Sequence, residues 1–269
     1  MNKSLLLFLA AICVCSPSAN SQQFSEAIED NSFWVEEAYN QEARVVQHIS
    51  TGFYQRDSKN FLFTFTQEYP LGGQTHQLSY TIPYQSMHAG SQGIGDILIN
   101  YRYQWWNDHD WCWIAPRFSL ILPTGNSSSG LGMGVVGFQT CIPASKRWSD
   151  QWVTHGNIGV TLLPNDEGAA SSGRSVHHTL PSFFIGGSGI WLVNDNFNLM
   201  CEVLDSYNSA IDASGSVHYE NQTIISPGVR VAINAGTLQI VPGAALPVTV
   251  TSQNTKMDIY GYLSFEHPF

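Results

Sequence analysis

Five charged residues occupy positions where apolar and polar side chains alternate along the chain. They are Arg102, Arg117, Glu202, Arg230 and Asp258. A period of two places them on one face of extended segments, opposite a face rich in Ile, Leu, Val and Phe. Charged groups that face an aqueous path select ions, whereas in a packed interior they pair with one another. These residues are therefore pore-lining candidates, with ion pairing as the alternative.

His155 and Asn157 complete this group of pore-lining candidates. Thr154 and Ile158 mark the apolar face of their segment, so the histidine and the asparagine point to the opposite side. A serine beside the histidine would make a nucleophilic hydrolase site. No serine shares their segment at adjacent spacing, and we therefore predict no catalytic residues and no enzyme.

Other histidines are spaced in a way that could hold a metal ion. His177 and His178 follow Asp166 and Glu167, and His109 lies between two aspartates. Imidazole and carboxylate groups are common ligands of divalent cations. Because solvated loop histidines are more common than metal ligands, we predict no metal ion and no cofactor.

The elements that must position these residues are strands. About twelve segments of alternating character follow residue 42, at 43–56, 60–69, 74–85, 94–105, 111–122, 133–144, 151–163, 178–193, 197–207, 222–233, 236–250 and 255–269. They suit the roughly 9 to 11 residues that a tilted strand needs to cross a bilayer. The pattern predicts an all-β fold, a transmembrane antiparallel up-and-down β-barrel of about 12 strands. Residues 178–193 show no clean alternation, so the sequence does not assign their faces.

The connections between these segments alternate in length. Tight turns such as "PLGG", "NDHD" and "NDN" alternate with longer stretches such as "PTGNSSSGLG", "PNDEGAASSGRSV" and "NSAIDASGSVHYE". Outer-membrane barrels carry short turns at the periplasmic rim and longer loops outside the cell. We therefore expect both ends of the barrel at the short-turn rim.

Aromatic residues gather beside the short turns. They are Trp105, Trp106, Trp111, Trp113, Trp148, Trp152, Trp191 and Phe197. Because amphipathic rings favour the membrane–water interface, this placement predicts one aromatic belt. Phe269 falls at the same rim. By resemblance to other outer-membrane barrels, we expect it to be the assembly signal that the barrel-assembly machinery reads.

The start of the chain predicts export. Residues 1–21 have a lysine-bearing start, an apolar run and small residues before the expected cleavage site, which is typical of a signal peptide. Residues 22–42 are acidic and do not alternate. We interpret them as a periplasmic N-terminal segment, with a helical turn or a plug as alternatives, and residues 43–269 as the barrel.

The composition narrows the partners and the location. Charged residues make up 12% of the chain, and the formal charge is −10. An acidic chain without Lys or Arg clusters argues against a nucleic-acid partner. No stretch reaches the roughly 18 apolar residues of a membrane helix. The expected partners are outer-membrane lipid, the barrel-assembly machinery and a small-molecule solute, and the expected location is the bacterial outer membrane of a Gram-negative cell.

Five stretches resemble a family of outer-membrane barrels, the MetA-pathway (phenol degradation) or putative transporter family. They are "EEAYNQEARVVQH", "GIGDILINYRYQ", "APRFSLILPTGN", "GLGMGVVGFQTCIP" and "HGNIGVTLLPN". The resemblance implies a porin or transporter and brings no catalytic residues with it. The resulting expectation is a narrow channel or transporter for small solutes. The alternatives are a surface hydrolase of the barrel lipase type and a non-conducting structural barrel.

Overall fold

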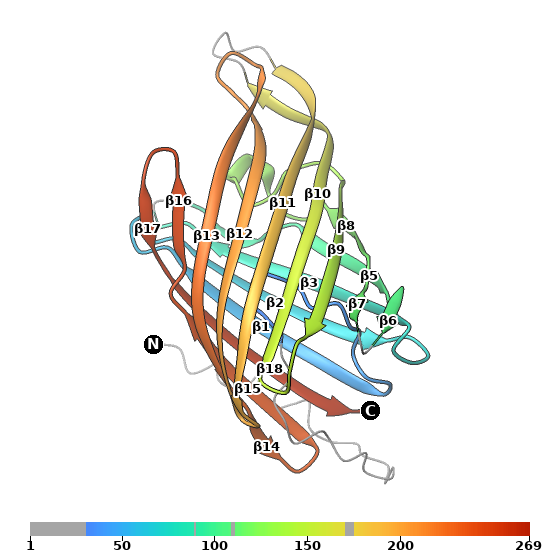
Figure 1. Ribbon diagram of the computed structural model, residues 1–269. Helices are drawn as coiled ribbons and strands as arrows, with labels where there is room; N and C mark the ends of the chain where they lie inside the picture. The colour runs from blue at the N-terminus through green and yellow to red at the C-terminus, as the bar shows by residue number, and fades with distance from the viewer. Residues whose placement is uncertain (1–30, 89, 109–110, 170–174) are drawn as a thin grey trace, which may run out of the picture.

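The computed structural model describes residues 31–88, 90–108, 111–169 and 175–269. All strands in these ranges belong to one antiparallel sheet, which closes into a barrel where the first strand pairs with the last (Figure 1). The closing ladder is continuous from Val45–Pro268 to Tyr54–Ile259. The predicted signal peptide, residues 1–21, and His109 lie outside the described residues.

The strands follow one another around the barrel in chain order. Their bounds are β1 (Val45–Tyr54), β2 (Phe61–Pro70), β3 (His76–Ser86), β4 (Gln92–Ile94), β5 (Ile97–Tyr103), β6 (Trp106–Asp108), β7 (Cys112–Ile114), β8 (Arg117–Leu122), β9 (Gly137–Arg147), β10 (Trp152–Ala169), β11 (Ser175–Asn194), β12 (Phe197–Ile211), β13 (Val217–Val231), β14 (Ile233–Ala235), β15 (Leu238–Ala245), β16 (Val248–Thr251), β17 (Thr255–Met257) and β18 (Ile259–Pro268). Four strands of the wall consist of two pieces each: β4 with β5, β7 with β8, β15 with β16, and β17 with β18. The short pieces β6 and β14 extend two of the hairpins. The barrel therefore has 12 strands, which confirms the predicted fold.

Side chains alternate between the exterior and the interior of the barrel, as the period-two pattern predicts. On the neighbouring strands β5 and β8, Tyr101 and Phe118 are exposed, whereas Asn100, Arg102 and Ser119 are buried. A contiguous apolar exterior of this kind is the lipid-contacting band of an outer-membrane barrel. The polar residues face a lumen.

The structure assigns the faces of β11, which the sequence left open. Phe183 and Trp191 point outward, and Leu180 and Ile190 are buried inside the barrel. Alternation was hidden because apolar side chains stand on both faces of this strand. The inward ones pack within the lumen and are not in contact with water.

The two rims of the barrel differ, although less in loop length than the sequence indicated. The stretches expected as long loops after residues 163 and 207 are mostly strand, because β10 to β13 continue as paired hairpins far beyond the neighbouring strands (Figure 1). In the turn between β12 and β13, the Asp212 carboxylate accepts the backbone N–H groups of Ser214 and Ser216. Such an Asx turn lets the ladder continue to the tip.

The loop after β8 is a loop as predicted and contains the 3-10 helix η1 (Ser127–Ser129). No helix in the described part of the chain is long and apolar enough to cross a membrane.

Most of the predicted aromatic belt is exposed at the short-turn rim. Trp105, Trp111 and Trp148 are each at least 60% exposed, and the rings of Trp152 and Trp191 stack on neighbouring strands. Trp113 and Phe197 are partly covered. At the same rim the Phe269 N–H donates to the Arg44 carbonyl, so both ends of the sheet meet there.

The exterior band gives a first prediction. Ile158 is 57% exposed on β10, and it follows Trp152 of the rim by six positions on the same strand. Replacement by lysine should destabilise the folded barrel by about 2–4 kcal/mol in phospholipid vesicles, because a charge then faces hydrocarbon. The matched change Ser128→Lys, in the loop after β8, should leave the unfolding midpoint in urea nearly unchanged. Equal effects of both changes would contradict the orientation of the barrel in lipid.

Candidate functional site

The lumen is not empty, because residues 31–44 run along its inner wall. We call this stretch the inner segment. It contains no helix or strand in the described residues, and Val35, Ala38 and Asn40 are at most 3% exposed. Residues 31–42, the described part of the predicted N-terminal segment 22–42, thus lie inside the barrel without helix or strand.

One carboxylate fixes the first half of the inner segment. Glu202, fully buried on β12, accepts the backbone N–H groups of Phe33, Trp34 and Val35 on a single oxygen, at 2.8–3.0 Å. The inner segment has no neighbouring strand to accept hydrogen bonds from its backbone N–H groups. Each such group would be costly to bury without an acceptor. Glu202 therefore supplies the hydrogen-bond acceptor that a neighbouring strand would otherwise provide.

Wall residues on β9 and β10 hold the middle of the inner segment. The Asn157 side chain accepts the Glu36 N–H at 2.6 Å and donates to the Glu36 carbonyl at 2.9 Å. The Ser145 hydroxyl oxygen accepts the Ala38 N–H at 2.7 Å and lies 2.7 Å from Nδ1 of His155. These paired contacts fix both the position and the direction of the backbone.

Three wall glycines make room for the apolar side chains of the inner segment. A methyl group at Gly228 or Gly243 would come within 2.7 or 2.9 Å of the Phe33 ring, and one at Gly186 within 3.0 Å of Val35. Phe33 also packs against Tyr260 and Tyr262 with ring centroids 5.2 Å apart. The wall is therefore shaped to receive this segment.

The last part of the inner segment binds wall side chains near the short-turn end of the lumen. The Gln104 side chain donates to the Ala38 carbonyl and accepts the Asn40 N–H, and Gln77 accepts the Gln41 N–H at 2.6 Å. Gln104 follows β5, and Gln77 is near the start of β3, both next to the short turns. Residues 38–41 thus follow the wall at this end, past the neighbouring strands β9, β8, β5 and β3.

Two arginines of the wall bind acidic residues of the inner segment. Arg117 forms a side-on pair with Glu36, with Nη2–Oε1 and Nε–Oε2 distances of 2.7 and 2.9 Å. Arg102 lies 3.3 Å from Glu36 and 3.3 Å from Glu37. Partial burial raises the pKa of the Glu36 carboxyl, but the two guanidinium groups outweigh this effect and hold that pKa below its ordinary value.

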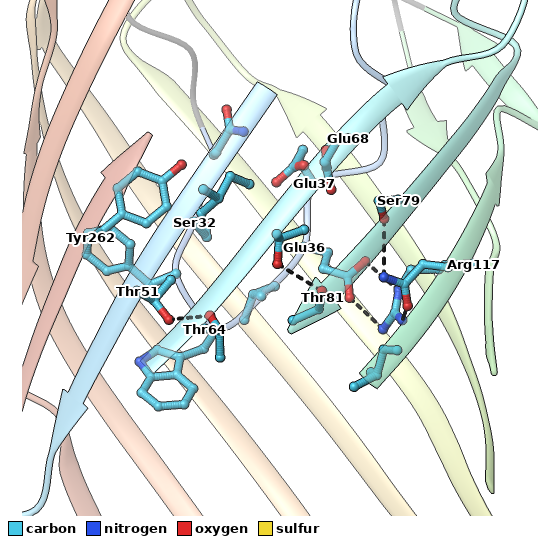
Figure 2. Close-up of a pocket in the computed structure, with 18 of the residues that line it drawn as sticks. Ser32, Glu36, Glu37, Thr51, Thr64, Glu68, Ser79, Thr81, Arg117 and Tyr262 are labelled. Carbon is cyan, nitrogen blue, oxygen red and sulfur yellow. Dashed lines mark hydrogen bonds and ion pairs between the residues drawn. The ribbon is translucent and has the colours of Figure 1, made fainter. Parts of the chain in front are cut away.

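A cavity of about 350 Å³ remains between the inner segment and the opposite wall. Figure 2 shows its two sides: Ser32, Glu36 and Glu37 on the inner segment, and hydroxyl-bearing residues on the wall. Thr51 and Thr64 lie 2.6 Å apart through their hydroxyl oxygens, as part of this polar wall. The ion pairs of Arg102 and Arg117 border the cavity at one end and aromatic rings at the other.

The seven predicted candidates all lie on the interior side of the wall, and six of them contact the inner segment. Arg102, Arg117, Asn157 and Glu202 bind it as described, and Arg230 donates to the Asn31 carbonyl at 2.5 Å. The ring of His155 lies edge-on to Tyr39. Asp258 is the exception, since its carboxylate accepts the Arg56 N–H at the opposite rim.

Two details differ from the sequence expectation. The ion-pair partners of Arg102 and Arg117 are Glu36 and Glu37, and neither Glu202 nor Asp258 pairs with these arginines. Because the sequence assigns residues 22–42 to a segment outside the barrel, it does not indicate Glu36 and Glu37 as partners of these arginines. Sequence reasoning also missed Ser145, which reaches His155 from the neighbouring strand through the register Ser145–His155.

The serine and histidine do not face lipid. Ser145 is 1% and His155 3% exposed, and the inner segment covers both from the lumen side. Asp166 and Glu167 lie opposite His178 and His177 in the register of β10 and β11. Among the described residues no group of three or more His, Cys, Asp and Glu gathers as a metal site.

Comparisons with known proteins agree on the fold. The chain is similar to the COG4313 outer membrane channel from Pseudomonas putida F1, with a TM-score of 0.62 and 14% identity over 86% of this chain and 98% of that one. It is also similar to the NanC porin, with a TM-score of 0.56 and 7% identity over 82% of this chain and 100% of that one. The sequence matches no protein-family model and no curated protein. The fold is thus that of outer-membrane channels, and the resemblance to the MetA-pathway family stays a prediction.

Removal of the Glu202 carboxylate tests how the inner segment is held. Glu202→Ala leaves three backbone N–H groups without their acceptor, so the inner segment should bind the wall more weakly by about 1–3 kcal/mol. Protease cleavage within residues 31–44 should become faster in the folded barrel. Asp258→Ala is the matched control, because it removes a buried carboxylate that does not touch the inner segment. If both variants resist protease as the wild type does, the Glu202 carboxylate does not hold the inner segment against the wall.

Acid should loosen a different contact of the inner segment, the ion pairs of Glu36 with Arg117 and Arg102. Because the folded-state pKa of Glu36 lies below its ordinary value of 4.5, the ion pair contributes fully above that value. Its contribution is lost as the pH falls through the lowered pKa. Protease cleavage of the inner segment should therefore accelerate as the pH falls below the ordinary glutamate pKa of 4.5. Glu36→Gln should be cleaved faster at neutral pH and lose this part of the pH response, and a wild-type acid response in that variant would refute the assignment.

Proposed function

We propose that the protein is an outer-membrane channel for small solutes whose path is narrowed by its own inner segment. The observation that carries this proposal is the cavity of about 350 Å³ inside the barrel, between the inner segment and the wall of β1, β2 and β3. A barrel that served only as a scaffold could fill its interior with wall side chains. Here polar and charged groups border a space of the size of small-molecule sites.

The inner segment is suited to act as a removable closure. It is held by hydrogen bonds and ion pairs from many strands, and its residues 38–41 bind side chains near the short-turn end of the lumen. Polar contacts of this kind can be exchanged for water at modest net cost. Movement of the inner segment would join the cavity to both rims, and this movement is the opening step in our proposal.

The location and the assembly of the barrel belong to the same proposal. The apolar exterior and the exposed tryptophans at one rim fit the bacterial outer membrane, with lipid as the partner of the exterior. Phe269 is 65% exposed at the end of the closing strand, next to Tyr69. This position suits the proposed assembly signal.

A surface hydrolase is disfavoured by position. Ser145 and His155 approach to 2.7 Å, but both are buried in the lumen beneath Ala38. An ester lipid in the membrane would have to cross the barrel wall to reach them. The contacts of this pair with the inner segment favour a positioning role.

Conductance in planar lipid bilayers tests the channel. The wild type should give small or infrequent steps, and deletion of residues 31–41 should raise the single-channel conductance several-fold, because the deletion opens the short-turn end. Heat-modifiable migration in gels confirms that the deleted form still folds, and Glu202→Ala offers a second variant with the full chain. A folded deletion variant that conducts no ions would leave the structural barrel as the better account.

A further inference from the structure

We infer that Arg117 and Arg102 form a binding site for the carboxylate of a small monoanionic solute, and that Glu36 occupies this site in the closed channel. The inference rests on the proposed function and names the chemical class of the solute. Glu36 belongs to the inner segment, not to the wall, so its carboxylate is held here as a ligand would be held (Figure 2).

The wall holds Arg117 in place without help from Glu36. Its Nη1 donates to Asn100 at 3.2 Å and to the Ser119 hydroxyl, and its Nη2 donates to Gln139 at 2.7 Å. All three partners are wall residues. A guanidinium fixed in this way keeps its fork ready for a carboxylate, which is the geometry that makes arginine a specific carboxylate binder.

The carboxylate of Glu36 is positioned for exchange. The side chains of Arg102 and Arg117 are 6% and 11% exposed, whereas that of Glu36 is 30% exposed and borders the cavity. A solute in the cavity can therefore approach the arginines from the side on which Glu36 now lies. The backbone at Glu36 binds the side chain of Asn157, and the described residues 31–44 form no strand, so this part of the inner segment has no ladder to break.

Charge balance selects a monoanion. Glu36 and Glu37 together neutralise the two guanidinium groups, and Glu68 borders the same cavity. A solute with one carboxylate replaces Glu36 charge for charge and can take over its hydrogen bonds. A neutral solute would leave a buried guanidinium without its counter-ion, and a dianion would add a negative charge beside Glu37 and Glu68; both are unfavourable.

Propionate is the probe for this site, because it reproduces the Glu36 side chain beyond the α-carbon. Addition of propionate to the full-length protein should speed protease cleavage of the inner segment and raise the open probability in planar bilayers. The uncharged isostere propionamide and the dianion succinate should do neither. Equal concentrations of potassium chloride control for ionic strength.

Variants at both partners distinguish a binding site from a structural contact. Arg117→Gln should abolish the response to propionate, and Arg117→Lys, which keeps the charge and loses the fork, should retain only part of it. Glu36→Gln removes the internal competitor, so isothermal titration should show propionate binding at least about tenfold tighter than in the wild type. Heat-modifiable migration checks that each variant is folded.

The outcomes separate this inference from the proposed function. If the wild type conducts but propionate, propionamide and succinate act alike, the carboxylate site is wrong and the channel stands. If no form conducts, the channel is wrong, yet cleavage of the inner segment that responds to propionate alone still supports the site. If Glu36→Gln binds propionate no better than the wild type, Glu36 does not occupy the solute site.

Discussion

A polar lumen inside an apolar shell must find partners for its charges and for any backbone that enters it. The carboxylate of Glu202 and the guanidinium groups of Arg102 and Arg117 lie inside the barrel with little exposed surface, so each is costly to leave without a hydrogen-bond partner or a counter-ion. The inner segment has the opposite need, since its backbone has no strand neighbour. Each supplies what the other lacks: three N–H groups for Glu202, and two carboxylates for the arginines. The other contacts of the inner segment with the wall add to these hydrogen bonds and ion pairs.

The same constraint explains the glycines of the wall. Gly186, Gly228 and Gly243 lie on inward positions where a side chain would meet Val35 or Phe33. Glycine in a strand weakens the sheet, and it often marks a place where another group approaches closely. The wall thus has no side chains at the positions where Val35 and Phe33 fill the space. The inner surface of the barrel is therefore complementary in shape to the inner segment.

The barrel could be predicted from the sequence because each strand repeats one simple rule. The alternation of Ile99, Asn100, Tyr101 and Arg102 assigns faces without knowledge of any neighbour. The inner segment follows no such rule. Its conformation is set by contacts such as Glu36 with Asn157, 121 positions apart, and a single sequence carries no signal for that pairing. The Ser145–His155 contact was missed for a related reason, since it depends on the register between two strands. The approach of Val35 to the inward-facing Gly186 of β11 is likewise not visible in the pattern of that strand.

The central claim is that the inner segment lies against the wall and closes the short-turn end of the lumen. The most direct test is a disulfide between the two residues that meet there, Ala38→Cys with Ser145→Cys, in a background without Cys112, Cys141 and Cys201. The account predicts that the oxidised protein forms this cross-link in outer membranes, that its conductance is reduced, and that a reductant restores the conductance in the same bilayer. Failure of the folded double variant to cross-link, or conductance that is identical before and after reduction, would contradict it.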